Sequence, residues 1–332
     1  MEKHRSLSAF VLLLPLVSLL LFGCGHAEKY EESFFSMDTV VTFTFYENKD
    51  NISALCLSLL SETEKEITEC GGYMIIAEND NTAVNLNDTL ASIIKKSLFV
   101  SSLSDGYYDI TVAPLVSLWN IREAKVPPTQ DEINAVLDLV GYNSLSLDGN
   151  TLYLQRKGSG VDFGSAGKGA AGDIVAEKLR ENGITSGIIN LGGNVRVFGE
   201  NPKNQEGKFV VGIKDPFGKS SIIGTVRVKD TNVITSGAYE RFFIYENERY
   251  HHLLDPKTGY PANNGLESVT VICSDGAFAD MLSTALYVAG FESAKNMLDT
   301  LGSMYPDLAA VFVFEDGSVS SFNTDMYEAE FK

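Results

Sequence analysis

The segment GIINLGGNVRVFG, residues 187–199, indicates how this chain folds. Two apolar runs, residues 187–191 and 195–199, flank the pair Gly192-Gly193, and this pattern predicts two strands joined by a tight turn. Strands continue to dominate the rest of the chain instead of alternating strictly with helices, which predicts an α+β fold with a largely antiparallel sheet. The further strands are predicted at residues 40–46, 209–213, 222–228, 232–235, 242–245, 250–254, 268–272, 309–314 and 319–322.

Helical patterns flank these strands. Apolar residues recur every three or four positions between turn residues, which predicts amphipathic helices that cover the sheet. We find no internal repeat and no linker after residue 36, so residues 36–332 are predicted to form one domain. The helices are predicted at residues 52–68, 89–104, 129–139, 170–181, 277–289 and 293–301, and a hairpin at residues 144–155.

The first 35 residues resemble a bacterial lipoprotein leader. Lys3 and Arg5 precede an apolar run, residues 7–22, and Gly23-Cys24 follows it. We predict a signal peptide at residues 1–23, a lipidated Cys24, and a tether at residues 24–35. An ordinary secretory leader or a short membrane anchor is the alternative. The lipid would hold the protein on the extracytoplasmic face of a cell membrane, which is the periplasmic side where there are two membranes.

Composition limits the partners of the domain. The 332 residues carry a formal net charge of −18, which disfavours binding to nucleic acid. An anionic substrate would need a locally positive site or a metal ion. Cys56, Cys70 and Cys273 show no zinc-binding spacing, and Cys56 with Cys70 is either a disulfide or two buried thiols.

A base is predicted in YHHLLDPKTGYP, residues 250–261. The chain has four histidines, and the two outside this segment, His4 and His26, lie near the N-terminus. An imidazole has the pKa of a general base near neutral pH. Because neighbouring residues of a strand face opposite sides, only one of His251 and His252 can face a given site.

A phosphate site is predicted in VDFGSAGKGAAGD, residues 161–173. Its glycines let the backbone approach a ligand, Lys168 supplies charge, and the helix predicted from residue 170 offers free N–H groups. Gly169 after Lys168 excludes a Walker loop. A plain tight turn is the alternative.

Two further motifs could bind a ligand. Asp280 and Thr284 lie four residues apart in ADMLSTAL, so they share a helix face and could hold Mg²⁺; alternatively, the Thr284 hydroxyl bonds its own backbone. The segment of residues 104–120 contains Tyr107, Tyr108 and Trp119, which could stack on a ring system or simply pack in the core.

As an ordered set, these motifs resemble the ApbE family, the FAD:protein FMN transferases. The set also includes Thr235-Ser236-Gly237, and the likeness runs from Met37 to about Gly290. The resemblance implies a single T-fold-like domain that binds FAD and Mg²⁺ and cleaves the diphosphate. It further implies attachment of FMN, through a phosphoester, to a threonine of an exported redox or electron-transfer protein, with release of AMP.

The resemblance also assigns roles to residues. His252 would be the catalytic base, and Asp255 would either orient its ring or serve only its own turn. Mg²⁺ would be held by Ser165, through its backbone carbonyl, together with Asp280 and Thr284. The residues that would contact FAD are Met37, Tyr73, Tyr107, Tyr108, Asp109, Asp162, Lys168 and Leu254.

The chain departs from the family pattern at a few positions. Asp38 stands where the family often has glycine, Gly167 where alanine is usual, Ala238 where a polar residue is usual, and Ser283 where some relatives have an acid. Two other functions share the same predicted site. One is a Mg²⁺-dependent FAD pyrophosphatase with water as acceptor, and the other is a lipid-tethered flavin-binding protein without turnover, which would need neither His252 nor the Asp280/Thr284 pair.

Overall fold

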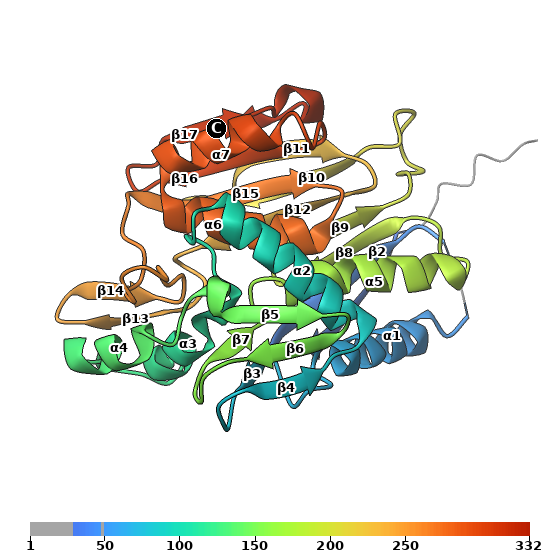
Figure 1. Ribbon diagram of the computed structural model, residues 1–332. Helices are drawn as coiled ribbons and strands as arrows, with labels where there is room; N and C mark the ends of the chain where they lie inside the picture. The colour runs from blue at the N-terminus through green and yellow to red at the C-terminus, as the bar shows by residue number, and fades with distance from the viewer. Residues whose placement is uncertain (1–28, 48–49) are drawn as a thin grey trace, which may run out of the picture.

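The computed structural model describes residues 29–47 and 50–332 (Figure 1). The predicted signal peptide and Cys24 lie outside these residues. Within the described ranges, no helix has both the length and the apolar character needed to cross a bilayer. The three cysteines in them, Cys56, Cys70 and Cys273, are free thiols rather than disulfide partners.

One eight-stranded sheet organises the domain. Every neighbouring pair of its strands is antiparallel, which confirms the predicted α+β class. The order across the sheet is β1 (Tyr30–Ser36), β2 (Thr39–Phe45), β8 (Gly187–Leu191), β9 (Asn194–Phe198), β12 (Thr231–Gly237), β15 (Leu266–Cys273), β16 (Ala309–Phe314) and β17 (Val319–Phe322).

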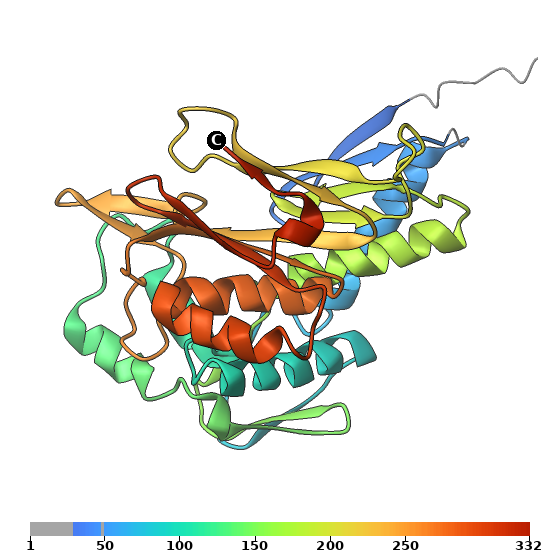
Figure 2. The same cartoon turned by 90° about the horizontal axis from the view of Figure 1, so that it is seen from above.

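The two faces of this sheet are covered differently (Figures 1 and 2). Helices pack on one face: α1 (Ile52–Ile67), α2 (Asp88–Leu103), α5 (Gly167–Glu181), α6 (Gly276–Ala289) and α7 (Phe291–Leu301). A small sheet of β10 (Phe209–Lys214), β11 (Ile222–Val228) and β18 (Glu330–Phe331) covers part of the other face through an apolar cluster that includes Phe209, Val226 and Val311. All side chains of β15 are buried because both of its faces are covered.

Smaller elements surround the ends of α5 and α6. A two-stranded ribbon of β13 (Phe242–Tyr245) and β14 (Glu248–His251) forms a sheet of its own beside α3 and α4 (Figure 1). The remaining elements are β3 (Met74–Ile76) paired with β7 (Gly160–Asp162), the sheet of β4 (Thr82–Asn85), β6 (Thr151–Leu154) and β5 (Leu145–Asp148), and the helices α3 (Ala113–Trp119) and α4 (Gln130–Leu137).

Three predicted boundaries are displaced by three or more residues. Residues assigned to the tether form β1, which pairs with β2 along its whole length, so the sheet begins at Tyr30 rather than after residue 35. The strand predicted at residues 250–254 ends at His251. Helix α5 begins at Gly167, three residues before the predicted start, so Lys168 and Gly169 lie in its first turn rather than in a loop.

Helices α5 and α6 cross with their backbones in close approach. A Cβ atom built on Gly169 would lie 2.0 Å from the Gly276 carbonyl oxygen and 2.9 Å from the Asp280 Cβ atom. In the other direction, a Cβ on Gly276 would lie 2.4 Å from the Gly169 carbonyl oxygen. Only glycine therefore fits at the crossing, and this close approach brings the first turn of α5 against Asp280.

We expect Gly169→Ala to destabilise the protein, because the new methyl group has no space against backbone atoms. Overpacking of this kind costs about 1–3 kcal/mol, which corresponds to a fall in Tm of several degrees for a domain of this size. Gly167→Ala, two residues earlier in the same helix, is the matched control, since its Cβ would meet the Ile67 Cγ2 atom at an ordinary 3.5 Å. Calorimetric melting of both variants checks this. Equal Tm values would contradict the close approach of α5 and α6 at Gly169.

Candidate active site

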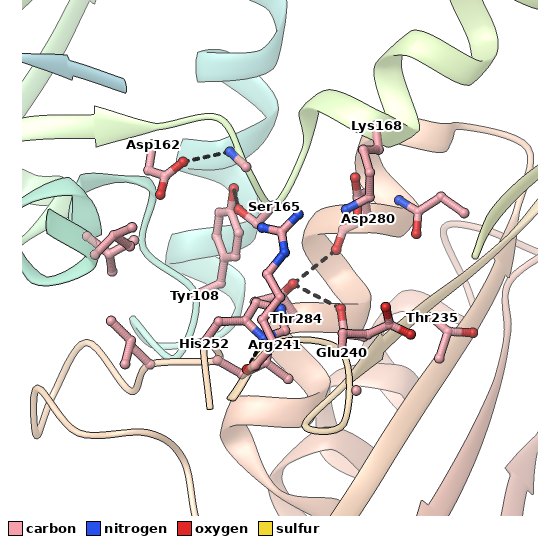
Figure 3. A pocket seen from close by; sticks show the side chains of 18 of the residues that line it. Tyr108, Asp162, Ser165, Lys168, Thr235, Glu240, Arg241, His252, Asp280 and Thr284 are labelled. Atoms are coloured by element: carbon pink, nitrogen blue, oxygen red, sulfur yellow. Dashed lines mark hydrogen bonds between the residues drawn. The ribbon is translucent and has the colours of Figure 1, made fainter. Parts of the chain in front are cut away.

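Two cavities open side by side between the ribbon, α3 and the first turn of α5. The first has a volume of about 330 Å³ and the second about 310 Å³. His252 and Lys168 line both, and Asp280 lines the first (Figure 3). The residues common to both cavities are Asp38, Val116, Asp162, Gly164, Lys168, Arg241, His252 and Leu254.

The ribbon positions His252 at this shared wall. Phe242 pairs with His251, so Arg241 and His252 face each other just beyond the paired residues. The Arg241 carbonyl oxygen accepts from the His252 backbone N–H at 3.1 Å and lies 3.3 Å from the His252 Nδ1 atom. Because a carbonyl only accepts, Nδ1 carries the proton and donates it. Nε2 is then the unprotonated nitrogen, which can accept a proton.

The surroundings keep the His252 imidazole neutral. Burial, and after it the nearby charges of Arg241 and Lys168, together lower the pKa of His252 from 6.5 to about 3. Both effects disfavour the protonated ring, which would be one more cation in a partly dry site. A neutral imidazole is the form that a general base requires.

His251 points away from the cavities, as expected for neighbouring strand residues. Its side chain is 5% exposed and its Nδ1 atom accepts from the Leu253 backbone N–H at 3.2 Å. Its Nε2 atom lies 2.9 Å from the Ala262 carbonyl oxygen, to which it donates. Both ring nitrogens are therefore used within the fold, and burial lowers the pKa of His251 to about 4.

The first turn of α5 supplies the polar wall opposite the ribbon. Lys168 lines both cavities from this turn, where its own charge and the positive end of the helix dipole favour an anion. The Asp162 carboxylate accepts from the Gly164 backbone N–H at 2.7 Å. Burial raises the pKa of Asp162, while that hydrogen bond and the charges of Arg241 and Lys168 act in the opposite direction.

Asp280 is tied to the same turn. Its Oδ2 atom accepts from the Gly169 backbone N–H at 2.9 Å, and the residue is 4% exposed. In a regular helix, that N–H would donate to the carbonyl of Ser165, four residues back. The bond to Asp280 leaves the Ser165 carbonyl without this donor, while the Ser165 hydroxyl donates to the Tyr108 hydroxyl at 3.3 Å.

Hydroxyl groups extend the oxygen-rich side of the first cavity. The Ser236 Oγ atom lies 3.1 Å from the Thr284 Oγ1 atom and 2.8 Å from the Ser283 Oγ atom. Thr284 also donates to the Asp280 carbonyl at 3.3 Å. This is the bond to the helix backbone that the sequence left open as an alternative. The Thr284 hydroxyl therefore has neighbours in the fold and still lines the cavity.

The donor set suits Mg²⁺ rather than a softer metal. Asp280, Thr284 and the Ser165 carbonyl offer only oxygen atoms, and Mg²⁺ commonly takes one or two carboxylates and keeps places for water and phosphate. Among residues 29–47 and 50–332, no group of three or more His, Cys, Asp or Glu side chains could hold a metal ion. A transition-metal site of that kind is therefore not formed by the described side chains.

The other predicted FAD contacts lie around the two cavities. Met37 and Tyr73 line the second cavity, where the Glu64 carboxylate accepts from the Met37 backbone N–H and from the Tyr73 hydroxyl. Tyr107 and Tyr108 line the first. Trp119, by contrast, is buried and donates to the Gly259 carbonyl at 2.7 Å, so it anchors the DPKTG turn instead of offering a stacking surface.

Two predicted acids turn out to support the backbone. Asp109 lines the first cavity, but its carboxylate accepts from the backbone N–H groups of Thr111 and Tyr142. Asp255 lines neither cavity, and its Oδ1 atom accepts from the Lys257 backbone N–H at 2.9 Å. The structure thus does not bring Asp255 to the His252 ring, whose Nδ1 partner is the Arg241 carbonyl.

Sequence reasoning missed several residues of the site. Arg241 lines both cavities, and burial together with Arg122 lowers its pKa. Asp38 also lines both and forms an ion pair with Arg122 at 3.0 Å. It occupies a left-handed conformation, φ 59°, in the two-residue turn between β1 and β2, a conformation that favours glycine. Asn194 and Glu240 line the first cavity.

Comparison with known proteins identifies the family of this fold and site. The model of the ApbE family matches residues 37–312. The chain belongs to the ApbE family. A protein of Klebsiella pneumoniae (strain 342) named FAD:protein FMN transferase is 30% identical over 299 residues, which cover 87% of this chain and 90% of that relative. A protein of the same name from Treponema pallidum (strain Nichols) is 30% identical over 260 residues, 73% of this chain and 70% of the relative.

Solved ApbE structures share the fold. The ApbE protein of Thermotoga maritima superposes with a TM-score of 0.77 at 28% identity, covering 91% of this chain and 100% of that one. A variant of the flavin transferase ApbE of Vibrio cholerae in which a histidine is replaced by glycine gives a TM-score of 0.75 at 25% identity, with coverage of 91% and 100%. The predicted family, the fold class and the enzyme class, a transferase, are therefore confirmed.

We expect the His252 imidazole to stay neutral from about pH 8 to below pH 5, because burial, Arg241 and Lys168 lower its pKa to about 3. The unfolded chain would take up a proton near pH 6.5, whereas the folded chain would not. Folding stability should therefore decrease on acidification below about pH 6.5, by at most about 1.4 kcal/mol per pH unit for this ring.

NMR titration of the histidine ring protons checks the pKa, and the His252→Gln variant identifies which signals belong to His252. The same variant should lose less folding stability than the parent when the pH is lowered below about 6.5. A His252 midpoint between about pH 6 and 7 would contradict the described environment.

Proposed function

We propose that this protein transfers FMN from FAD to a threonine hydroxyl of an acceptor protein and releases AMP. The observation that carries the proposal is the meeting of His252, Lys168 and Asp280 around one cavity. Membership of the ApbE family and the printed name of the relatives, FAD:protein FMN transferase, support the same reaction.

The shape of the site suits a dinucleotide. Two cavities of similar volume meet at a wall that carries Lys168, Arg241 and His252. FAD likewise has two ring systems joined by a diphosphate. We place the diphosphate at the shared wall, where the two cations and the first turn of α5 can bind it, and one ring system in each cavity.

The charges of the site support a requirement for Mg²⁺. The first cavity is lined by five acids, Asp38, Asp109, Asp162, Glu240 and Asp280, and by only two cations, Lys168 and Arg241. A diphosphate would add negative charge to this set. Mg²⁺ held by Asp280, Thr284 and the Ser165 carbonyl would neutralise part of that charge and polarise the phosphoryl group.

The residues of the chain can then perform the transfer. His252 Nε2 accepts the proton of the threonine hydroxyl while the hydroxyl oxygen bonds to the FMN phosphorus. The bond from that phosphorus to the AMP oxygen breaks, and AMP leaves with the electron pair. Lys168 and Arg241 offset the charge that develops on the phosphoryl oxygens, and the hydrogen bond from Nδ1 to the Arg241 carbonyl holds the ring.

For the location of the enzyme, we propose a lipid anchor at Cys24 on the extracytoplasmic face of the membrane. Support comes from the leader pattern of residues 1–24 and from the start of β1 at Tyr30, which leaves a short tether. Cys24→Ser should move the protein from the membrane fraction to the soluble fraction. Retention of this variant in the membrane would argue for an uncleaved leader instead.

An acceptor assay tests the reaction. The protein is incubated with FAD, Mg²⁺ and an exported candidate acceptor, and flavin fluorescence of the acceptor on a denaturing gel is read together with AMP release. We expect a fluorescent acceptor band and AMP in equal amounts. AMP without a band would point to the pyrophosphatase, and binding of FAD with neither product would point to a flavin-binding protein.

Two variants assign the roles in the same assay. His252→Ala should lower the rate by about 10²–10⁴-fold, as expected for loss of a general base, while FAD still binds. Asp280→Asn should lower the rate and weaken the response to Mg²⁺, although its amide oxygen can still accept from the Gly169 N–H and so preserve the fold. Unchanged transfer by His252→Ala, or an unchanged Mg²⁺ titration for Asp280→Asn, would remove that residue from the proposed mechanism.

A further inference from the structure

The side-chain amide of Asn194 is buried without a partner. The residue is 4% exposed, and its Nδ2 atom has no hydrogen-bond partner among the residues that the structure describes. Buried polar atoms are nearly always hydrogen-bonded in folded proteins, so an exception calls for an explanation. Asn194 lines the first cavity, so a rotation of its amide would present the Nδ2 atom to a bound molecule that supplies the missing acceptor.

The position of Asn194 indicates which part of a ligand it would meet. It is the first residue of β9, and Arg196, two residues further, lies on the same face of the strand. That face packs against α5, since a Cβ on Gly172 would lie 3.2 Å from the Arg196 Cβ atom. Lys168, one helical turn before Gly172, lines the cavity together with Asn194. The free amide is therefore on the side of the cavity where the first turn of α5 can bind an anion.

We propose that Asn194 is a substrate-binding residue whose amide donates a hydrogen bond to a phosphate oxygen of the nucleotide. This inference rests on the proposed function, because it takes the ligand of the cavity to be FAD. Phosphate oxygens only accept, the Nδ2 atom only donates, and Lys168 already favours an anion on this side. The same contact would help to fix the diphosphate relative to His252 on the opposite wall.

The test separates a ligand contact from a structural role. Removing a donor that has no partner should leave the unliganded fold as stable as before or slightly more stable. We therefore expect the full-length Asn194→Ala protein, in detergent with Mg²⁺, to keep the Tm of the parent without nucleotide. Its Kd for FAD and for ADP should rise by about ten- to a hundredfold, whereas its Kd for riboflavin, which has no phosphate, should stay the same.

Asn190→Ala is the matched control from the same hairpin. Asn190 is exposed, lines neither cavity, and accepts from the Gly193 backbone N–H at 2.8 Å. Its replacement should lower the Tm without nucleotide but leave the Kd for FAD unchanged, which is the opposite of the pattern expected for Asn194→Ala.

Asn194→Asp identifies the group that is bound. A carboxylate of the same shape would repel phosphate, so its Kd for FAD and ADP should exceed that of Asn194→Ala. Equal or tighter binding by Asn194→Asp would mean that the ligand group is a donor, such as a ribose hydroxyl, and would overturn the proposal. A parent-like Kd in Asn194→Ala would overturn it as well. If the parent itself bound no FAD, the proposed function would fall together with this inference.

Discussion

The site depends on one hydrogen bond between two helices, from the Gly169 N–H to the Asp280 carboxylate. This bond is possible because Gly169 and Gly276 allow the helices to approach at backbone distance. It places a carboxylate at the positive end of α5, where the helix dipole stabilises it. Because the Gly169 N–H donates to Asp280, it does not donate to the Ser165 carbonyl, as it would in a regular helix. A single contact thus positions two of the three proposed magnesium ligands beside Lys168.

The proposed catalytic base reaches this site from a separate part of the fold. His252 follows a two-stranded ribbon, and the Arg241 carbonyl holds both its backbone and its ring. The ribbon turns at Glu246 and Asn247, both with positive φ, and this turn sets the register that puts Arg241 opposite His252. Burial, and after it the charge of Arg241, keeps the imidazole neutral, so the residue that holds His252 in position also contributes to its protonation state.

Sequence reasoning recovered the parts of this account that have a local signal. Strands β8, β11 and β16 have the predicted bounds because their apolar runs end at glycine or charged residues. The pair Asp280 and Thr284 followed from helical spacing alone. The start of α5 was missed because Gly164, Gly167 and Gly169 disfavour a helix locally, and only the contact with α6 accounts for it. Arg241 lies in no predicted motif, and Asn194 follows Gly192-Gly193, which predicted only a turn, so their importance appears only when distant strands bring them to one cavity.

The central claim is that a divalent ion at Asp280 and an imidazole at His252 act on the same diphosphate. A crystal structure with Mn²⁺ in place of Mg²⁺ and with bound ADP tests it most directly, because anomalous scattering locates the metal. The account predicts Mn²⁺ beside the Asp280 carboxylate, the Thr284 hydroxyl and the Ser165 carbonyl, with phosphate oxygens between the metal and the His252 ring. Metal at another place, or phosphates remote from His252, would contradict it.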